Sequence, residues 1–177
     1  MNFYTGIGSR ETPKDVIILF KNIGKILGKT QYTLRSGHAI GADQAFEEGC
    51  DMVNGKKEIY LPWENFEKSN SNLIVRDKKA FEIAENFHPY WYNLKPGAKK
   101  LQARNSHQIL GKDLNTLTNF VICWTKDGKG TGGTGQAIRI ANYYKIPVFD
   151  AGRFSDIKIL IEELKNFIKN NKYNKTQ

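Results

Sequence analysis

The second half of the chain contains the segment whose residue types point most directly to chemistry. It reads Gly130-Thr131-Gly132-Gly133-Thr134-Gly135, and it lies between an apolar run typical of a buried strand and a pattern typical of a helix. A backbone without Cβ atoms can approach an anion closely, and the free N–H groups at the start of a helix favour negative charge. Four glycines in six positions exceed what a tight turn requires. The segment therefore predicts a phosphate-binding loop, with two threonine hydroxyls as further donors.

Two shorter glycine-containing segments have the same context, since each follows an expected strand and precedes an expected helix. They read Gly6-Ile7-Gly8-Ser9-Arg10 and Ser36-Gly37-His38-Ala39-Ile40-Gly41. In a parallel sheet such loops meet at the carboxyl ends of the strands, which is where ligands bind. We therefore expect all three segments to converge on one crevice.

The three segments match neither of two well-known nucleotide-binding signatures. The first segment lacks the third glycine of the dinucleotide-binding fingerprint, and no loop ends in Gly-Lys-Ser or Gly-Lys-Thr. The sequence therefore disfavours ordinary NAD(P) binding and P-loop ATP binding.

Several polar residues near these loops each allow two interpretations. Asp43 could accept ribose hydroxyls, or its charge could stabilise the first turn of a helix. His38 could hydrogen-bond a ligand or be solvated, and Ser36 fits a phosphate donor better than a nucleophile, because no triad partners are apparent. His88 and His107 have no metal-ligand spacing, so we expect no metal ion and no cofactor.

Short apolar runs alternate with helical patterns along the chain, as the positions of these loops require. Expected strands cover residues 3–6, 32–35, 58–61, 120–124 and 147–149. The first helix is expected to begin after Thr12, its predicted N-cap, and a second helix follows residue 41 and ends at residue 49. Two more helices are expected, at residues 136–144 and after Ser155. Residues 72–110 are helical in pattern apart from the loop 88–97. The alternation predicts a Rossmann-like three-layer α/β/α sandwich with a mostly parallel central sheet.

Composition places the chain among ordinary globular proteins. Its 177 residues include 27 Lys and Arg and 18 Asp and Glu, which gives a formal net charge of +9. The length suits one domain, residues 1–177, in which about 165–177 form a basic helix end and tail. No apolar run approaches the roughly 20 residues of a membrane span and no secretory signal is visible, so we expect a cytoplasmic protein without a membrane partner. Cys50 and Cys123 are expected to be reduced thiols.

The motifs together resemble the SLOG superfamily, which joins the Smf/DprA proteins to the LOG-type nucleotide hydrolases. The segment Ser36-Gly37-His38-Ala39-Ile40-Gly41-Ala42-Asp43 and the pair Arg104-Asn105 are DprA-like, and Gly132-Gly133-Thr134-Gly135 is similar to the core of the LOG motif. The resemblance covers residues 3–150, and the compact chain also looks like the DprA-like proteins of bacteriophages. It implies a Rossmann-like fold that binds nucleotides or their derivatives, often as a dimer.

One departure from this resemblance bears on catalysis. LOG hydrolases have a glutamate shortly after the Gly-Gly-x-Gly-Thr motif, and counting along this chain puts Gln136 at the threonine position and Arg139 at the glutamate position. An arginine cannot act as a general base at neutral pH, but it can hold a phosphate bidentately. We therefore expect a protein that binds a phosphorylated nucleotide or nucleotide-derived signal, as a sensor or a sequestering protein. Two alternatives stay open, a nucleotide N-glycosidase and a DprA-like protein that binds single-stranded DNA.

The expected ligand site combines the three loops with the residues that the resemblance adds. Residues 91–110 are expected to fold over the crevice and to contribute Arg104, within one subunit or across a homodimer. No catalytic residue is assigned. The residues expected to contact the ligand are Gly8, Ser9, Arg10, Ser36, Gly37, His38, Asp43, Arg104, Gly132, Gly133, Thr134, Gly135, Gln136 and Arg139.

Overall fold

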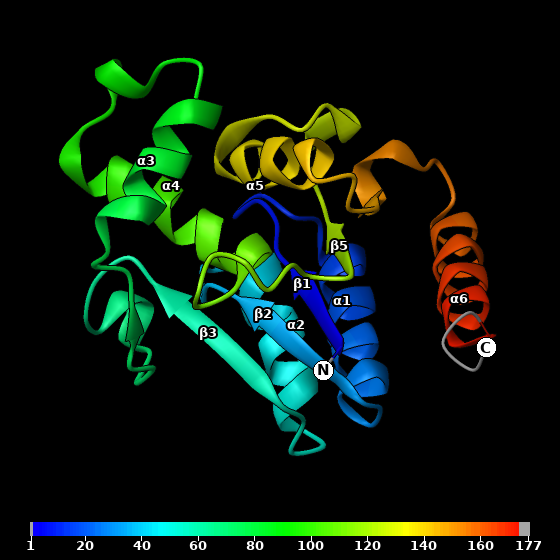
Figure 1. Ribbon diagram of the computed structural model, residues 1–177. Helices are drawn as coiled ribbons and strands as arrows, with labels where there is room; N and C mark the ends of the chain where they lie inside the picture. The colour runs from blue at the N-terminus through cyan, green and yellow to red at the C-terminus, as the bar shows by residue number, and fades with distance from the viewer. Residues whose placement is uncertain (1, 174–177) are drawn as a thin grey trace.

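A parallel sheet forms the centre of the computed structural model, which describes residues 2–173 (Figure 1). Its strands are β1 (Asn2–Gly6), β2 (Tyr32–Ser36), β3 (Lys57–Leu61), β4 (Leu73–Ile74), β5 (Phe120–Cys123) and β6 (Val148–Asp150). They are arranged in the order β4-β3-β2-β1-β5-β6, and every neighbouring pair is parallel. The predicted α/β class with a parallel sheet is confirmed.

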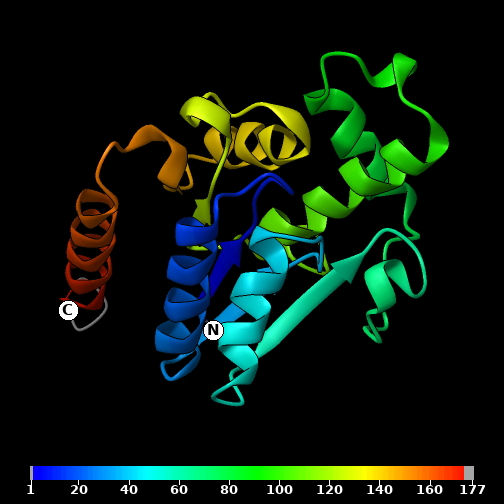
Figure 2. The same cartoon turned by 180° about the vertical axis from the view of Figure 1, so that it is seen from behind.

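Two layers of helices cover the sheet, and together with it they make the three-layer arrangement. The helices are α1 (Lys14–Gly28), α2 (Ala42–Asp51), α3 (Lys78–Phe87), α4 (Pro96–Leu110), α5 (Gly132–Tyr143) and α6 (Ile157–Tyr173). Short 3-10 helices lie at η1 (Phe66–Lys68), η2 (Trp91–Asn93), η3 (Lys126–Gly128) and η4 (Ala151–Arg153). In both views α6 lies at one end of the molecule and α3 and α4 lie at the other (Figures 1 and 2).

Each face of the sheet has its own apolar core. On one face α1, α2 and α6 bury Phe20, Phe46 and Leu160 against the sheet. On the other face α3, α4 and α5 contribute small and branched residues, among them Ala80 and Ile140. All four residues of β5 are buried, because helices cover the strand on both faces, and a near-continuous apolar run is the expected sequence for such a strand.

The structure corrects three predicted boundaries. Residues 73–74 form a sixth strand inside the region predicted to be helical, and two residues are too few to show a strand pattern. The first helix begins after Pro13 and no side chain caps it, since the Thr12 hydroxyl donates instead to the Ser9 carbonyl (2.6 Å). Helix α5 begins at Gly132, so three glycines of the predicted loop, Gly132, Gly133 and Gly135, lie in its first turn.

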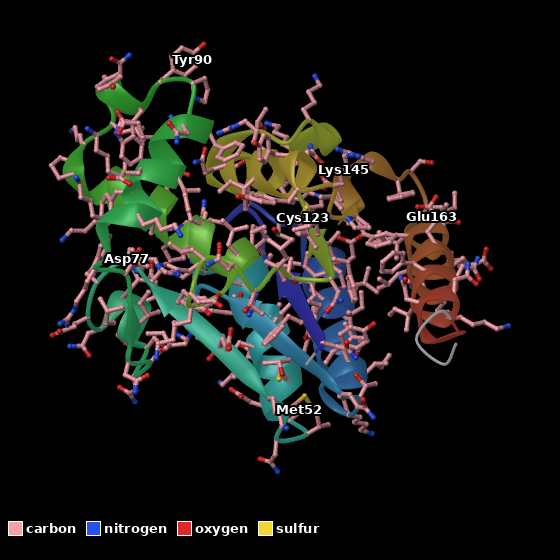
Figure 3. The ribbon with its side chains drawn as sticks, viewed as in Figure 1. Met52, Asp77, Tyr90, Cys123, Lys145 and Glu163 are labelled. Atoms are coloured by element: carbon pink, nitrogen blue, oxygen red, sulfur yellow. The ribbon has the colours of Figure 1, made fainter. Side chains whose placement is uncertain are left out.

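Other features of the chain follow from burial and length. Cys50 and Cys123 are buried free thiols, and Figure 3 shows Cys123 well inside the molecule while Tyr90 lies on its periphery. In the part of the chain that the structure describes, none of the helices combines the length and the apolar character needed to cross a bilayer. The predicted basic end at residues 165–177 includes the last turns of α6, and residues 174–177 lie outside the described part.

The contact between α1 and α2 generates a stability prediction. A methyl group on Gly49 would overlap the Lys21 carbonyl, so Gly49→Ala should push the helices apart and lower the free energy of unfolding by about 1–3 kcal/mol. Gly97 is the matched control, because a methyl group there meets only one atom, at 3.9 Å, near the start of α4. Urea denaturation should find Gly97→Ala as stable as the native chain or more so, and equal stability of both variants would contradict this packing.

Candidate functional site

A cavity of about 340 Å³ opens at the carboxyl ends of the strands. It is lined by the loop after β1, by α2 and the loop before it, by Phe66 of η1, by α4 and by the start of α5. Strands β1 and β5 are neighbours, and the helices that follow them, α1 and α5, pack on opposite faces of the sheet. Ligands of open α/β sheets bind at such a switch point, where the chain leaves adjacent strands in opposite directions.

The start of α5 presents free donors to this cavity. Its N-cap residue is Thr131, and no side chain makes a capping hydrogen bond there. The first N–H groups of a helix have no partner within the helix, so those of the first turn remain available to a ligand. A Cβ atom at Gly132 or Gly133 would meet nothing within 4 Å. The φ angle of +69° favours glycine at position 132, but packing gives no reason for glycine at position 133.

A buried ion pair lies on the opposite wall of the cavity. The Asp43 carboxylate accepts hydrogen bonds from the Gly8 and Gly37 N–H groups (both 3.1 Å) and lies 3.4 Å from Arg104 Nη1. Both side chains are almost completely buried. Burial raises the pKa of Asp43 and lowers the pKa of Arg104, and their mutual attraction offsets these shifts only in part. The pair is therefore costly to bury, which is characteristic of functional sites.

Backbone geometry brings Arg104 into this position. A Cβ atom at residue 37 would overlap the Arg104 guanidinium, so only glycine allows α4 to place the arginine against the loop after β2. The Arg104 Nε is buried and has no hydrogen-bond partner among the described residues. The guanidinium therefore has donor capacity that the described protein groups do not use.

Three amide side chains on one face of α4 connect the two walls. Asn105 Nδ2 donates to the Gly133 carbonyl (2.9 Å) and to Gln102 Oε1 (3.2 Å). In the orientation that satisfies both ends of its amide, Gln108 donates to Asn105 Oδ1 (3.0 Å) and accepts from Arg104 Nη1 (3.2 Å). This network fixes the start of α5 relative to the ion pair, and it makes the cavity a preformed site.

The rim of the cavity carries a second arginine. Arg10 is exposed and pairs with Glu67 of η1 at 2.9 Å. Ser9 Oγ accepts from the Glu11 N–H, which leaves its own proton available to a ligand. Phe66 and Leu101 supply apolar surface nearby.

The structure brings some of the predicted site residues together and separates others. Eight of the predicted residues line the cavity, namely Gly8, Ser9, Arg10, Asp43, Arg104, Gly132, Gly133 and Thr134. Gly37 lies against two of these residues, Asp43 and Arg104. The other five have different surroundings. Ser36 donates to the Gly6 carbonyl inside the sheet, His38 lines a second cavity, Gly135 packs on the Gly130 carbonyl, Gln136 donates to the Ala84 carbonyl and Arg139 donates to the Phe87 carbonyl.

Sequence reasoning did not single out Gln102, Gln108 or Phe66. The two glutamines flank Asn105 at spacings of three, which puts all three amides on one helix face. Polar residues at helical spacing in a helix that proves to be buried are the signal that could have identified them. For Phe66 the sequence offers no comparable signal.

Comparisons with known proteins find similarity in fold. No family model matches the chain, and no curated protein matches it. Two solved structures of the molybdenum cofactor carrier protein from Chlamydomonas reinhardtii are 14% identical, with TM-scores of 0.53 and 0.54. They match over 86% and 93% of this chain and 77% and 85% of theirs. DNA processing protein A from Helicobacter pylori is 20% identical, with a TM-score of 0.59 over 98% of this chain and 81% of that one. These matches are similarities of fold alone, and they agree with the Rossmann-like arrangement of the sheet and helices.

The buried pair predicts an unusual pattern of stabilities. Asp43→Asn leaves the Arg104 charge without its counterion and should lower the free energy of unfolding by about 3 kcal/mol. Adding Arg104→Met removes the unpaired charge, so the double variant should recover part of this loss. The rest remains because the asparagine NH2 faces one of the two backbone N–H groups that the carboxylate accepted. Chemical denaturation of the native chain, Asp43→Asn, Arg104→Met and the double variant measures this double-mutant cycle. A double variant less stable than both single variants would contradict this description of the pair.

Proposed function

We propose that the protein binds a phosphorylated nucleotide or a nucleotide-derived signalling molecule in the cavity at the carboxyl ends of the strands, as a sensor or a sequestering protein. One observation carries the proposal, the uncapped start of α5 opposite the buried Arg104. Free N–H groups, a helix dipole and a guanidinium all favour a phosphate group between them. Because Gly133 has no packing role, a close approach of the ligand to the backbone explains it.

The remaining surface of the cavity suits the rest of a nucleotide. Phe66 and Leu101 offer apolar contact for a base, and Gln102 and Thr134 offer polar groups for a base or a ribose. A volume of about 340 Å³ is at the lower end of the range for small-molecule sites, which fits a ligand of nucleotide size. The similar folds of a cofactor carrier and of a protein that binds single-stranded DNA also favour a binding role.

The carboxylates favour binding over N-glycoside hydrolysis, which needs a carboxylate at the anomeric centre. Both oxygens of Asp43 already accept N–H groups of the protein. Glu47 lines a different cavity and Glu64 pairs with Arg76 on the surface. Glu11 lies on the rim and is exposed, so Glu11→Gln is the variant that tests the enzyme alternative.

Binding through phosphate predicts a difference between nucleotides and nucleosides. Each charged hydrogen bond contributes about 1.5–3 kcal/mol, so losing the phosphate should weaken binding by about tenfold or more. In thermal-shift titrations nucleoside 5′-monophosphates should raise the melting temperature much more than the matching nucleosides. Chromatography of the same samples should recover the nucleotide unchanged. Equal shifts for nucleoside and nucleotide would contradict phosphate recognition. Free base that forms with the native chain but not with Glu11→Gln would favour the hydrolase alternative.

The glycine at position 133 allows a test that separates binding from folding. Gly133→Ala places a methyl group in open space, so the fold should be as stable as before or slightly more stable. The methyl group should keep a phosphate away from the backbone and weaken nucleotide binding by about tenfold, or about 1.4 kcal/mol. Gly97→Ala, at the start of α4 and outside the cavity, is the control for an added methyl group. Isothermal titration of both variants measures the effect, and unchanged affinity in Gly133→Ala would argue against phosphate at this helix end.

A further inference from the structure

A second cavity, of about 480 Å³, lies beyond the loop after β2 and is separate from the proposed nucleotide site. It is lined by His38 on that loop, by Glu47 of α2 and Lys57 of β3, and by residues 68–73. The two cavities share their walls, because Ala39 and Phe66 line the first while the neighbouring His38 and Lys68 line the second.

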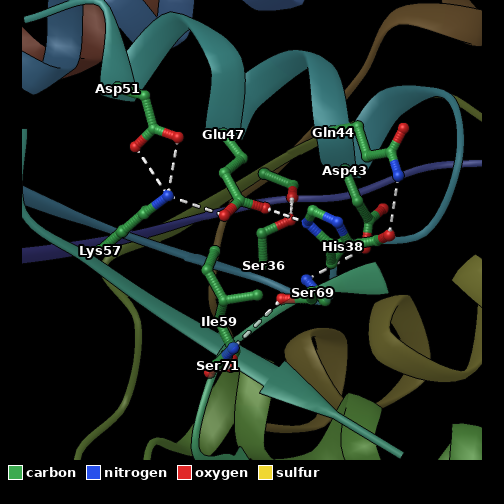
Figure 4. Close-up of polar contacts among 12 residues, drawn as sticks. Ser36, His38, Asp43, Gln44, Glu47, Asp51, Lys57, Ile59, Ser69 and Ser71 are labelled. Atoms are coloured by element: carbon green, nitrogen blue, oxygen red, sulfur yellow. Dashed lines mark hydrogen bonds and ion pairs between the residues drawn. The ribbon is translucent and has the colours of Figure 1, made fainter. Parts of the chain in front are cut away.

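A carboxylate holds the histidine of this second cavity in place (Figure 4). Glu47 Oε2 lies 2.5 Å from His38 Nδ1, and Glu47 Oε1 accepts from Lys57 Nζ at 2.7 Å. Lys57 also pairs with Asp51, and although burial alone lowers the pKa of Lys57, its hydrogen bonds to Asp51 and Glu47 raise the pKa overall. Glu47 therefore remains paired, and both of its oxygens are in use.

The groups that stay available include an ammonium and a hydroxyl donor. The Nζ of Lys68 has no hydrogen-bond partner within residues 2–173, and neither does the Nε2 of His38. Because Nδ1 donates to Glu47, Nε2 is a donor only when the ring carries both protons. The Ser69 hydroxyl accepts from the Ser71 N–H, so its proton is free to be donated. Asn70 and Asn72 add amide groups at the edge of the cavity. A cavity in which both Glu47 oxygens are occupied and an ammonium and a hydroxyl are free to donate is suited to an oxyanion.

Backbone conformation supports a role for these side chains. His38 and Lys68 have φ angles of +57° and +68°, in the left-handed region where glycine is favoured. Both residues line the same cavity, and residues held in this region cluster at functional sites.

We propose that this cavity is a second binding site, which takes the phosphate group of a small molecule through the His38 imidazolium, the Lys68 ammonium and the Ser69 hydroxyl. Glu47 is a positioning residue, because it orients the His38 ring and does not face the ligand with a free oxygen. The phosphate is either free phosphate or part of a sugar phosphate, since the recognised chemistry is the same. The site does not depend on the nucleotide site, and either proposal can fail alone.

Nitrogen–proton correlation spectra of the full chain test the second site. Titration with inorganic phosphate, at an ionic strength held constant with chloride, should give saturable shifts of the amides of residues 68–72 and of the His38 ring. Titration with ribose 5-phosphate should shift the same signals, and tighter binding than inorganic phosphate identifies a sugar phosphate as the ligand class. Shifts that do not saturate, or that are spread evenly over exposed lysines, would overturn the proposal.

Variants separate this site from the first cavity and from general charge effects. Lys68→Gln and His38→Asn should each weaken phosphate binding at residues 68–72 by about tenfold, and asparagine tolerates the left-handed backbone at position 38. Lys79→Gln, which removes an exposed lysine of α3 outside both cavities, and Gly133→Ala should leave this binding unchanged. Circular dichroism checks that all four variants are folded. Equal binding by Lys68→Gln and Lys79→Gln would contradict the site, whatever the result for the nucleotide.

Discussion

The buried carboxylate of Asp43 is the group on which the geometry of the candidate site depends. It accepts N–H groups from Gly8 and Gly37, which follow two neighbouring strands, and it faces Arg104 from the opposite side of the sheet. One carboxylate thereby fixes three segments that are far apart in the sequence. It also occupies donors that a ligand could otherwise use in two of the three glycine-containing loops. The first turn of α5 keeps its donors free, because no side chain caps it, and it meets the guanidinium across the cavity.

The order of the strands explains why these groups meet. Strands β1 and β5 lie side by side, and the chain leaves them toward opposite faces of the sheet. The loop after β1 and the start of α5 therefore border one opening. Helix α4 closes it, since its amides hold the Gly133 carbonyl and Arg104 together. The position of the Arg104 guanidinium requires glycine at position 37, where any side chain would occupy the same space.

The sequence was sufficient to predict the parallel sheet and the central part of the cavity, because strand ends and glycine loops are local patterns. Directions of side chains were harder to predict. Ser36 is the last residue of β2 and points into the sheet, where it donates to a carbonyl. Arg139 lies seven residues after Gly132, about 10 Å along the helix, and its guanidinium donates to Phe87 of α3 and to Gln136 without lining the cavity. The pair His38–Glu47 links a loop to a helix nine residues later, and only the fold shows that a cavity separate from the first opens beside it.

The most direct test of the central claim is a crystal structure of the protein with a nucleoside 5′-monophosphate. The proposal predicts phosphate density within hydrogen-bond distance, about 2.7–3.2 Å, of the N–H groups at the start of α5, with the Arg104 guanidinium facing it. Density for the base should lie beside Phe66 and Leu101. A nucleotide bound elsewhere on the molecule, with the first turn of α5 hydrated and the Asp43–Arg104 pair unchanged, would contradict the claim.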